Sequence, residues 1–192
     1  PGSLGAWGEL ERAKKRLVYS LLRFQLPLDC SPWGKGRLTF DFVRRALTGH
    51  QDGVITVDIR EADAVERERQ RLRFDEPYRS LLGHLRHESG HFYWMVLVEG
   101  SPRLDAFRRL FGDERSDYGA ALASHHAEGA PADWQSRHVS AYASAHPWED
   151  WAETWAHYLH MVDTLDSAQA TGVERHTGRV LGVLWPSRPR DV

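Results

Sequence analysis

The sequence predicts an α+β fold in which a small sheet near the N-terminus is followed by a mostly helical body. Two short runs rich in apolar and β-branched residues, at 38–43 and 54–59, are typical of strands, and most of the chain after residue 60 has helical spacing. The 192 residues, 41% of them hydrophobic and 27% charged, suit one packed core with a solvated surface. We therefore expect residues 1–192 to form a single domain.

The first 73 residues contain two predicted helices in addition to the two strands. Apolar side chains recur at helical intervals from Trp7 to Phe24 and predict a helix over 6–24, and the charged segment 61–73 is also expected to be helical. Between the strands, the sequence Thr-Gly-His-Gln-Asp-Gly of 48–53 is typical of a turn.

The helical body is expected to contain five helices separated by proline and glycine. Prolines stand near the start of three of them, where a missing N–H is tolerated. The tail 171–192 is rich in Gly, Pro and Arg, and its one apolar run, at 180–185, does not decide between a strand and disorder. The five predicted helices span 77–98, 102–111, 115–128, 132–145 and 147–165.

Charge and composition exclude several classes of function. Lys and Arg total 25 against 27 Asp and Glu, so the formal charge is −2 and we expect no nucleic-acid partner. No apolar run is long enough to cross a membrane and no signal peptide is evident, so we expect a cytoplasmic protein without a membrane partner. The single cysteine, Cys30, is expected to be inert and excludes a cysteine-based zinc site. The 11 histidines are the unusual feature.

The residues His87-Glu88-Ser89-Gly90-His91 form an H-E-x-x-H motif inside the predicted helix 77–98. Histidines four residues apart lie on one helical face, so both imidazoles can bind one Zn²⁺ at about 2.0–2.1 Å. Glu88 projects to the same side, where its carboxylate can take a proton from water whose pKa zinc lowers from 15.7 toward about 7. The plainer alternative is a pair of surface histidines that matches the motif by chance.

A catalytic zinc site needs a third protein ligand and an open position. Trp94 and Leu97 stand where the metzincin motif has glycine and histidine, which excludes that family. The remaining solution is a carboxylate from a downstream helix, and Glu149 and Glu153 share one face of the predicted helix 147–165. One of them can bind zinc while the other holds a ligand histidine in place.

With these residues the sequence resembles the gluzincin class of zinc metallopeptidases, in which H-E-x-x-H is followed some tens of residues later by E-x-x-x-D/E. The resemblance implies that Glu149 is the third ligand and that Glu153 contacts His87. The segment 149–153 (EDWAE) is similar to that of peptidases of the anthrax lethal factor type. Those enzymes carry a transition-state tyrosine seven residues before the ligand glutamate, and that position is Tyr142 here.

Over a longer stretch, from about Trp7 to Ala170, the chain resembles bacterial zinc-binding metallopeptidases. The resemblance implies a zincin-like domain with one catalytic zinc ion. Those proteins usually carry an N-terminal Cys-rich zinc ribbon that this sequence lacks, and nothing carries over to 171–192, where they continue differently. The segments that carry the resemblance are 76–79, 112–115, 140–144 and 149–160.

The other histidines and tyrosines have simpler interpretations. His84 is expected to lie behind the ligands or at the surface, and His146 to shape the start of the helix 147–165. His125 and His126 are expected on a solvated helix face, with an approach to the metal as their alternative. His157 and His160 are expected as buried hydrogen-bonding partners, with a contact to the site as their alternative. Tyr93 and Tyr118 are expected as core aromatics.

We therefore expect a zinc metallopeptidase that hydrolyses peptide bonds. His87, His91 and Glu149 would bind the ion. Glu88 would act as general base and then acid, and Tyr142 would donate to the oxyanion unless it is a core aromatic. The partner would be a peptide or protein substrate, held in extended form along an edge of the sheet. The alternatives are a zinc-binding interaction or sensor module without turnover, against which Glu88 argues, and a zinc hydrolase of non-peptide amides.

Overall fold

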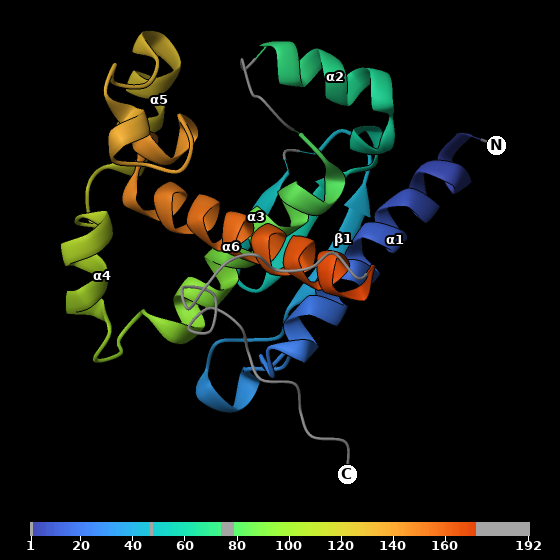
Figure 1. Cartoon of the computed structure of the whole chain (residues 1–192), viewed down its shortest axis with the longest axis horizontal. Coiled ribbons are helices and arrows are strands. Elements are labelled where there is room, and N and C mark those ends of the chain that lie inside the picture. The colour runs from blue at the N-terminus through green and yellow to red at the C-terminus, as the bar shows by residue number, and fades with distance from the viewer. Residues whose placement is uncertain (1, 47, 74–78, 172–192) are drawn as a thin grey trace.

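The computed structural model describes residues 2–46, 48–73 and 79–171, and it contains the expected small sheet and a mostly helical body (Figure 1). Short 3₁₀ turns lie between the main elements, at Ser31–Trp33, Ile59–Ala62, Trp134–Ser136 and Tyr142–Ala145. The strands are β1 (Thr39–Val43), β2 (Gly49–Gln51) and β3 (Val54–Asp58). The helices are α1 (Gly2–Arg23), α2 (Ala64–Arg73), α3 (Leu81–Leu97), α4 (Leu104–Phe111), α5 (Tyr118–Glu128) and α6 (Pro147–Ala170).

The sheet has a third strand that the sequence did not predict. Its order is β1-β3-β2, with β3 parallel to β1 and antiparallel to β2. Strand β2 lies inside the segment 48–53, and only Asp52 and Gly53, with φ of 50° and 87°, form the turn to β3. Glycine is required at the second turn position because a Cβ there would lie 2.7 Å from the carbonyl oxygen of Arg37. A strand of three residues is too short to show alternation in the sequence.

The predicted helix over 132–145 is wrong. This segment contains only the 3₁₀ turns Trp134–Ser136 and Tyr142–Ala145. Between them, His138 and Ser140 bind side chains of α6, and Ser140 Oγ also accepts a hydrogen bond from the backbone N–H of Ala143. Side-chain hydrogen bonds of this kind compete with helix formation. The segment therefore runs along α6 and does not form an α-helix.

The predicted helices also differ from the observed ones at their ends, as α3 and α6 illustrate. Helix α3 begins after Ser80, whose hydroxyl caps it by accepting a hydrogen bond from the N–H of Gly83, and Pro77 lies outside the described residues. Helix α6 starts at Pro147 as expected but continues to Ala170. The tail prediction for 171–192 falls almost entirely outside the described residues.

Helix α3 lies at the centre of the molecule, between α6 on one side and α1 and the sheet on the other (Figure 1). The buried residues that join these elements are apolar: Leu10, Leu17, Leu21, Ile55, Val57, Leu85, Phe92, Tyr93 and Leu159. A second cluster, of Trp94, Val98 and Phe107, joins α3 to α4. The helix that carries H-E-x-x-H is therefore held on both sides by the core.

Helices α3 and α6 approach each other closely at Gly90. A Cβ at this position would lie 2.9 Å from the Cα of Ala152, so only glycine fits without a backbone shift. Two tryptophans of α6 bind the inner residues of the motif: Trp151 Nε1 donates to the carbonyl oxygen of Gly90 at 2.8 Å, and Trp155 Nε1 donates to Ser89 Oγ at 3.1 Å. This contact fixes the distance between the motif and α6.

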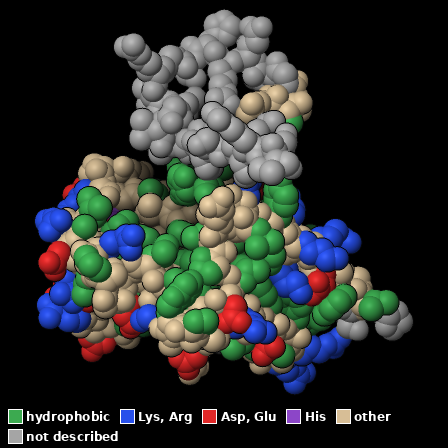
Figure 2. Space-filling view, turned by 90° about the horizontal axis from the view of Figure 1, so that it is seen from below, with side chains coloured by type: hydrophobic (Ala, Val, Ile, Leu, Met, Phe, Trp, Pro, Cys, Tyr) green, Lys and Arg blue, Asp and Glu red, His purple; other side chains and the backbone are tan. Residues whose placement is uncertain are grey.

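The surface is mixed in charge. On the face shown in Figure 2, basic and acidic side chains lie among each other and between apolar ones. In the described part of the chain, no helix is both long and apolar enough to span a bilayer.

Candidate metal centre

The structure brings His87, His91 and Glu149 together at the crossing of α3 and α6. His87 Nε2 lies 3.0 Å from Glu149 Oε2, and His91 Nε2 lies 3.8 Å from Glu149 Oε1. One ligand atom from each of the three residues lies within 4.8 Å of the others. Two imidazole nitrogens and a carboxylate oxygen are the donor set of a catalytic zinc site with an open position.

The carboxylate of Glu149 is buried and only partly satisfied. Its residue is 1% exposed, and Oε2 accepts no hydrogen bond from the described part of the chain. A buried carboxylate oxygen without a donor is costly unless a cation lies next to it. The three residues therefore fit a divalent ion of the zinc type.

The charges within the cluster support the same conclusion. Burial would raise the pKa of Glu149, but the imidazole of His87, whose Nε2 lies 3.0 Å from Oε2, outweighs burial and holds the pKa at about 2. Burial would lower the pKa of His87, but Glu149 and Glu153 raise it well above its usual value. A proton and a metal ion compete for the same lone pair of His87 Nε2, so metal binding would release a proton.

Glu153 lies behind His87 and not in the cluster. Its Oε1 is 2.7 Å from His87 Nδ1, and its Oε2 accepts a hydrogen bond of 2.7 Å from Ser140 Oγ. With Nδ1–H donated to Glu153, the Nε2 of His87 faces Glu149. A carboxylate in this position fixes the tautomer and ring orientation of a ligand histidine.

Glu88 is buried next to the cluster, with 6% of its surface exposed. Its Oε1 lies 3.3 Å from Nε2 of His84, and His84 is not one of the three residues of the cluster. Burial would raise the pKa of Glu88, but the hydrogen bond of His84 and the charges of the neighbouring imidazoles lower it to about 2. The carboxylate is therefore ionised and can accept a proton.

Tyr142 lies beside the cluster at the start of the 3₁₀ turn Tyr142–Ala145. The centre of its ring is 6.0 Å from that of His87 and 5.8 Å from that of His125. Burial, with the charge of Glu149 as a further cause, raises the pKa of the phenol, so its hydroxyl stays protonated and can donate.

Tyr118 is a site residue that the sequence assigned wrongly to the core. Its side chain is 37% exposed, and its hydroxyl donates a hydrogen bond of 2.6 Å to Glu149 Oε1. Asp117 caps α5 and places Tyr118 in the first turn, beside α6. Tyr118 lies 31 residues from Glu149 in the chain, so no helical or strand spacing links the two in the sequence.

The remaining histidines in the described part of the chain lie outside the cluster. His146 caps α6: its Nδ1 accepts a hydrogen bond of 3.1 Å from the N–H of Trp148. His157 is exposed and not buried as predicted, and its Nδ1–H donates to the carbonyl oxygen of Glu153. His160 is bonded to Arg86 at 2.6 Å, and His126 is exposed.

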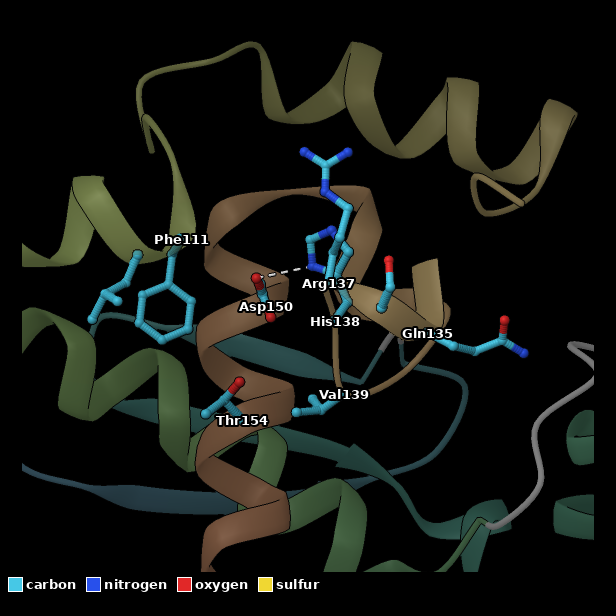
Figure 3. Close-up of a pocket in the computed structure, with 9 residues that line it drawn as sticks. Phe111, Gln135, Arg137, His138, Val139, Asp150 and Thr154 are labelled. Carbon is cyan, nitrogen blue, oxygen red and sulfur yellow. Dashed lines mark hydrogen bonds and ion pairs between the residues drawn. The ribbon is translucent and has the colours of Figure 1, made fainter. Parts of the chain in front are cut away.

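Asp150 points away from the cluster although it neighbours Glu149 in the chain. Figure 3 shows it directed at His138, whose Nδ1 lies 3.0 Å away, in a pocket of about 380 Å³ that Phe111, Val139 and Thr154 also line. Burial raises the pKa of Asp150. Of the acids in the segment 149–153, only Glu149 therefore belongs to the cluster.

Comparison with known proteins shows which protein family this chain resembles. The model of a family described as "putative zinc-binding metallo-peptidase" matches residues 3–184. Uncharacterized proteins of Mycobacterium bovis and of two strains of Mycobacterium tuberculosis are each 46% identical over 176 residues, which cover 88% of this chain and 52% of the relative. The chain thus spans about half the length of these curated relatives. No solved structure matches.

Proposed function

This chain belongs to the family of putative zinc-binding metallopeptidases, and on that premise we propose that it hydrolyses peptide bonds with one bound zinc ion. The observation that carries the proposal is the cluster of His87, His91 and Glu149 with the buried carboxylate of Glu88 beside it. A site that only binds metal for structure does not require an ionised carboxylate at that place.

The two histidines and Glu149 would hold the ion. Zinc supplies the Lewis acidity that lowers the pKa of bound water toward about 7 and polarises a carbonyl group. Glu153 and Ser140 orient His87, which keeps its Nε2 directed at the cluster.

Glu88 and Tyr142 would handle the charge that moves during the reaction. The ionised carboxylate of Glu88 accepts the proton of the attacking water and delivers it to the leaving amine. The phenol of Tyr142 donates a hydrogen bond to the substrate oxygen as that oxygen becomes negative.

A peptide substrate has an edge of the sheet available beside the cluster. In the described part of the chain, β2 pairs with β3 on one side only, and β2 packs against α3, where the ring of His50 lies 6.0 Å from that of Phe92. We propose that the substrate extends along β2, because backbone hydrogen bonds to a strand edge hold a peptide without regard to its sequence.

The test compares the wild-type protein with Glu88→Gln in zinc content and in cleavage of a random peptide pool. We expect the variant to keep stoichiometric zinc and to lose about 10²–10⁴-fold in hydrolysis, because amide replaces carboxylate where a proton must move. Glu128→Gln, an exposed glutamate at the end of α5, is the matched control and should not change activity.

Each of the other outcomes would indicate a different function. Loss of zinc from Glu88→Gln would make Glu88 a ligand. Stoichiometric zinc with no cleavage by the wild-type protein would favour the interaction or sensor module, and cleavage confined to small amides would favour a non-peptide hydrolase.

A further inference from the structure

His84 lies between two buried carboxylates. Its Nδ1 is 2.7 Å from Glu61 Oε2, and its Nε2 is 3.3 Å from Glu88 Oε1. Glu61 and Glu88 are 7% and 6% exposed. Because both ring nitrogens face acceptors, both act as donors, and His84 is a cation between two anions.

This chain of contacts continues to the sheet. The second oxygen of Glu61, Oε1, accepts a hydrogen bond from the hydroxyl of Thr48. Thr48 Oγ1 in turn accepts a hydrogen bond of 3.1 Å from the backbone N–H of Asp58, at the end of β3. Both oxygens of Glu61 are thereby occupied, and the carboxylate has one orientation relative to α3.

The electrostatics agree with this geometry. Burial would lower the pKa of His84, but its hydrogen bonds to Glu61 and Glu88 outweigh burial and raise the pKa to about 9. Burial would raise the pKa of Glu61, but His84 and Thr48 lower it. Each buried charge in the chain of contacts therefore has an opposite charge or a donor next to it, as buried charges require.

We propose that His84 and Glu61 are positioning residues for the base Glu88, an inference that rests on the proposed peptidase function. His84 holds Oε1 of Glu88, which leaves the other carboxylate oxygen to accept the proton of the attacking water. The same contact of 3.3 Å would restrain the Glu88 carboxylate, so that Glu88 serves as the base and not as a further ligand of the ion. Glu61 orients the ring of His84, since its hydrogen bond with Nδ1 directs Nε2 at Glu88.

The first test is a pair of variants at His84 in the zinc-loaded protein. His84→Leu removes the donor to Glu88, and we expect kcat to fall about 10–100-fold, the usual effect of losing such a partner, with KM and zinc content unchanged. His84→Gln keeps an N–H donor and should recover activity relative to His84→Leu. An unchanged kcat in His84→Leu, or no recovery by His84→Gln, would overturn the inference.

The second test is the coupling between Glu61 and His84. Glu61→Gln should lower kcat in the wild-type protein but have little further effect in His84→Leu, because Glu61 acts only through His84. Glu114→Gln is the matched control: Glu114 is 8% exposed and paired with Arg108 of α4, so its loss should change thermal stability and not kcat. Equal effects of Glu61→Gln in both backgrounds would contradict the proposal.

A measurement without substrate separates this inference from the proposed function. In the zinc-loaded protein, ¹⁵N NMR should show protons on both nitrogens of His84, and Glu61→Gln should remove that signature. A wild-type protein that keeps the signature but cleaves no peptide would refute the peptidase proposal alone. A wild-type protein that cleaves peptides with a singly protonated His84 would refute the positioning role alone.

Discussion

At the scale of single residues, side chains that the sequence makes equivalent have different surroundings. Glu149 and Glu153 are four residues apart on α6 and share one face. Yet Glu149 is 1% exposed and faces both histidines of the motif, whereas Glu153 meets only the far nitrogen of His87. The difference arises because α6 crosses α3, so that only its first turn reaches the open side of the imidazoles.

This difference predicts two separate effects on zinc binding. Glu149→Ala should abolish tight binding, because two histidines alone are a weak site. Glu153→Ala should reduce zinc affinity or activity only about 10–100-fold, the usual effect of a carboxylate that orients a ligand. Competition with a chromophoric chelator measures both affinities. Equal losses in the two variants would contradict the assignment of Glu149 as the ligand.

The two tyrosines near Glu149 predict a split between kcat and zinc affinity. Tyr142→Phe should lower kcat and leave KM and zinc content nearly unchanged, since an oxyanion donor contributes about 2.7–4 kcal/mol to the transition state. Tyr118→Phe removes the hydroxyl that binds Glu149, so it should weaken zinc binding instead. If Tyr142→Phe altered only thermal stability, Tyr142 would be a core aromatic.

At the scale of elements, the cluster of His87, His91 and Glu149 depends on the contact between α3 and α6. The histidines and Glu149 lie on different helices, and the distance between those helices is set where Gly90 meets Ala152. The tryptophans Trp151 and Trp155 add hydrogen bonds on the same contact. A change at Gly90 therefore reaches the cluster without touching any ligand.

Gly90→Ala should destabilise the protein by about 1–3 kcal/mol, the usual cost of overpacking, and should also weaken zinc binding because α6 must move. The matched control is Gly5→Ala at an exposed position near the start of α1, where a Cβ meets nothing within 4 Å. That control should be neutral or more stable by up to about 1 kcal/mol. Denaturant unfolding and zinc titration check both variants. Normal zinc affinity in Gly90→Ala would refute the claim that the packing of α3 on α6 sets the geometry of the cluster.

At the scale of the whole molecule, the proposed ion joins the two halves of the core. It would be held by α3, which packs on α1 and the sheet, and by α6, which closes the opposite side (Figure 1). An ion that binds only the folded state adds to the free energy of unfolding. Zinc should therefore stabilise the entire chain and not only its site.

Removal of zinc by a chelator should lower the melting temperature by roughly 5–10 °C, if free zinc in the loaded sample is about 100 times its dissociation constant. Added zinc should restore the original value. Glu149→Ala should show no such shift, because its cluster lacks the third ligand. A wild-type melting temperature that does not change after its zinc is removed would contradict a role of the ion in stability.

The parts of the site that could be predicted are those with local geometry. His87 and His91 share a face because any α-helix places residues four apart on one side, and the pattern of apolar residues predicts that helix. The same rule places Glu149 and Glu153 together on α6. The two strands β1 and β3 and six of the seven expected helices likewise result from periodicity and from proline and glycine signals.

The parts that could not be predicted depend on contacts between segments far apart in the chain. Tyr118 reaches Glu149 across 31 residues, and His84 reaches Glu61 across 23. The segment 132–145 does not form the predicted helix because Ser140 is hydrogen-bonded to Glu153 of α6. Periodicity describes one element at a time, whereas these hydrogen bonds exist only after the helices pack. The sequence therefore identified the residues of the cluster, His87, His91 and Glu149. Which side chains orient these residues is determined only by how α3, α5 and α6 pack against each other.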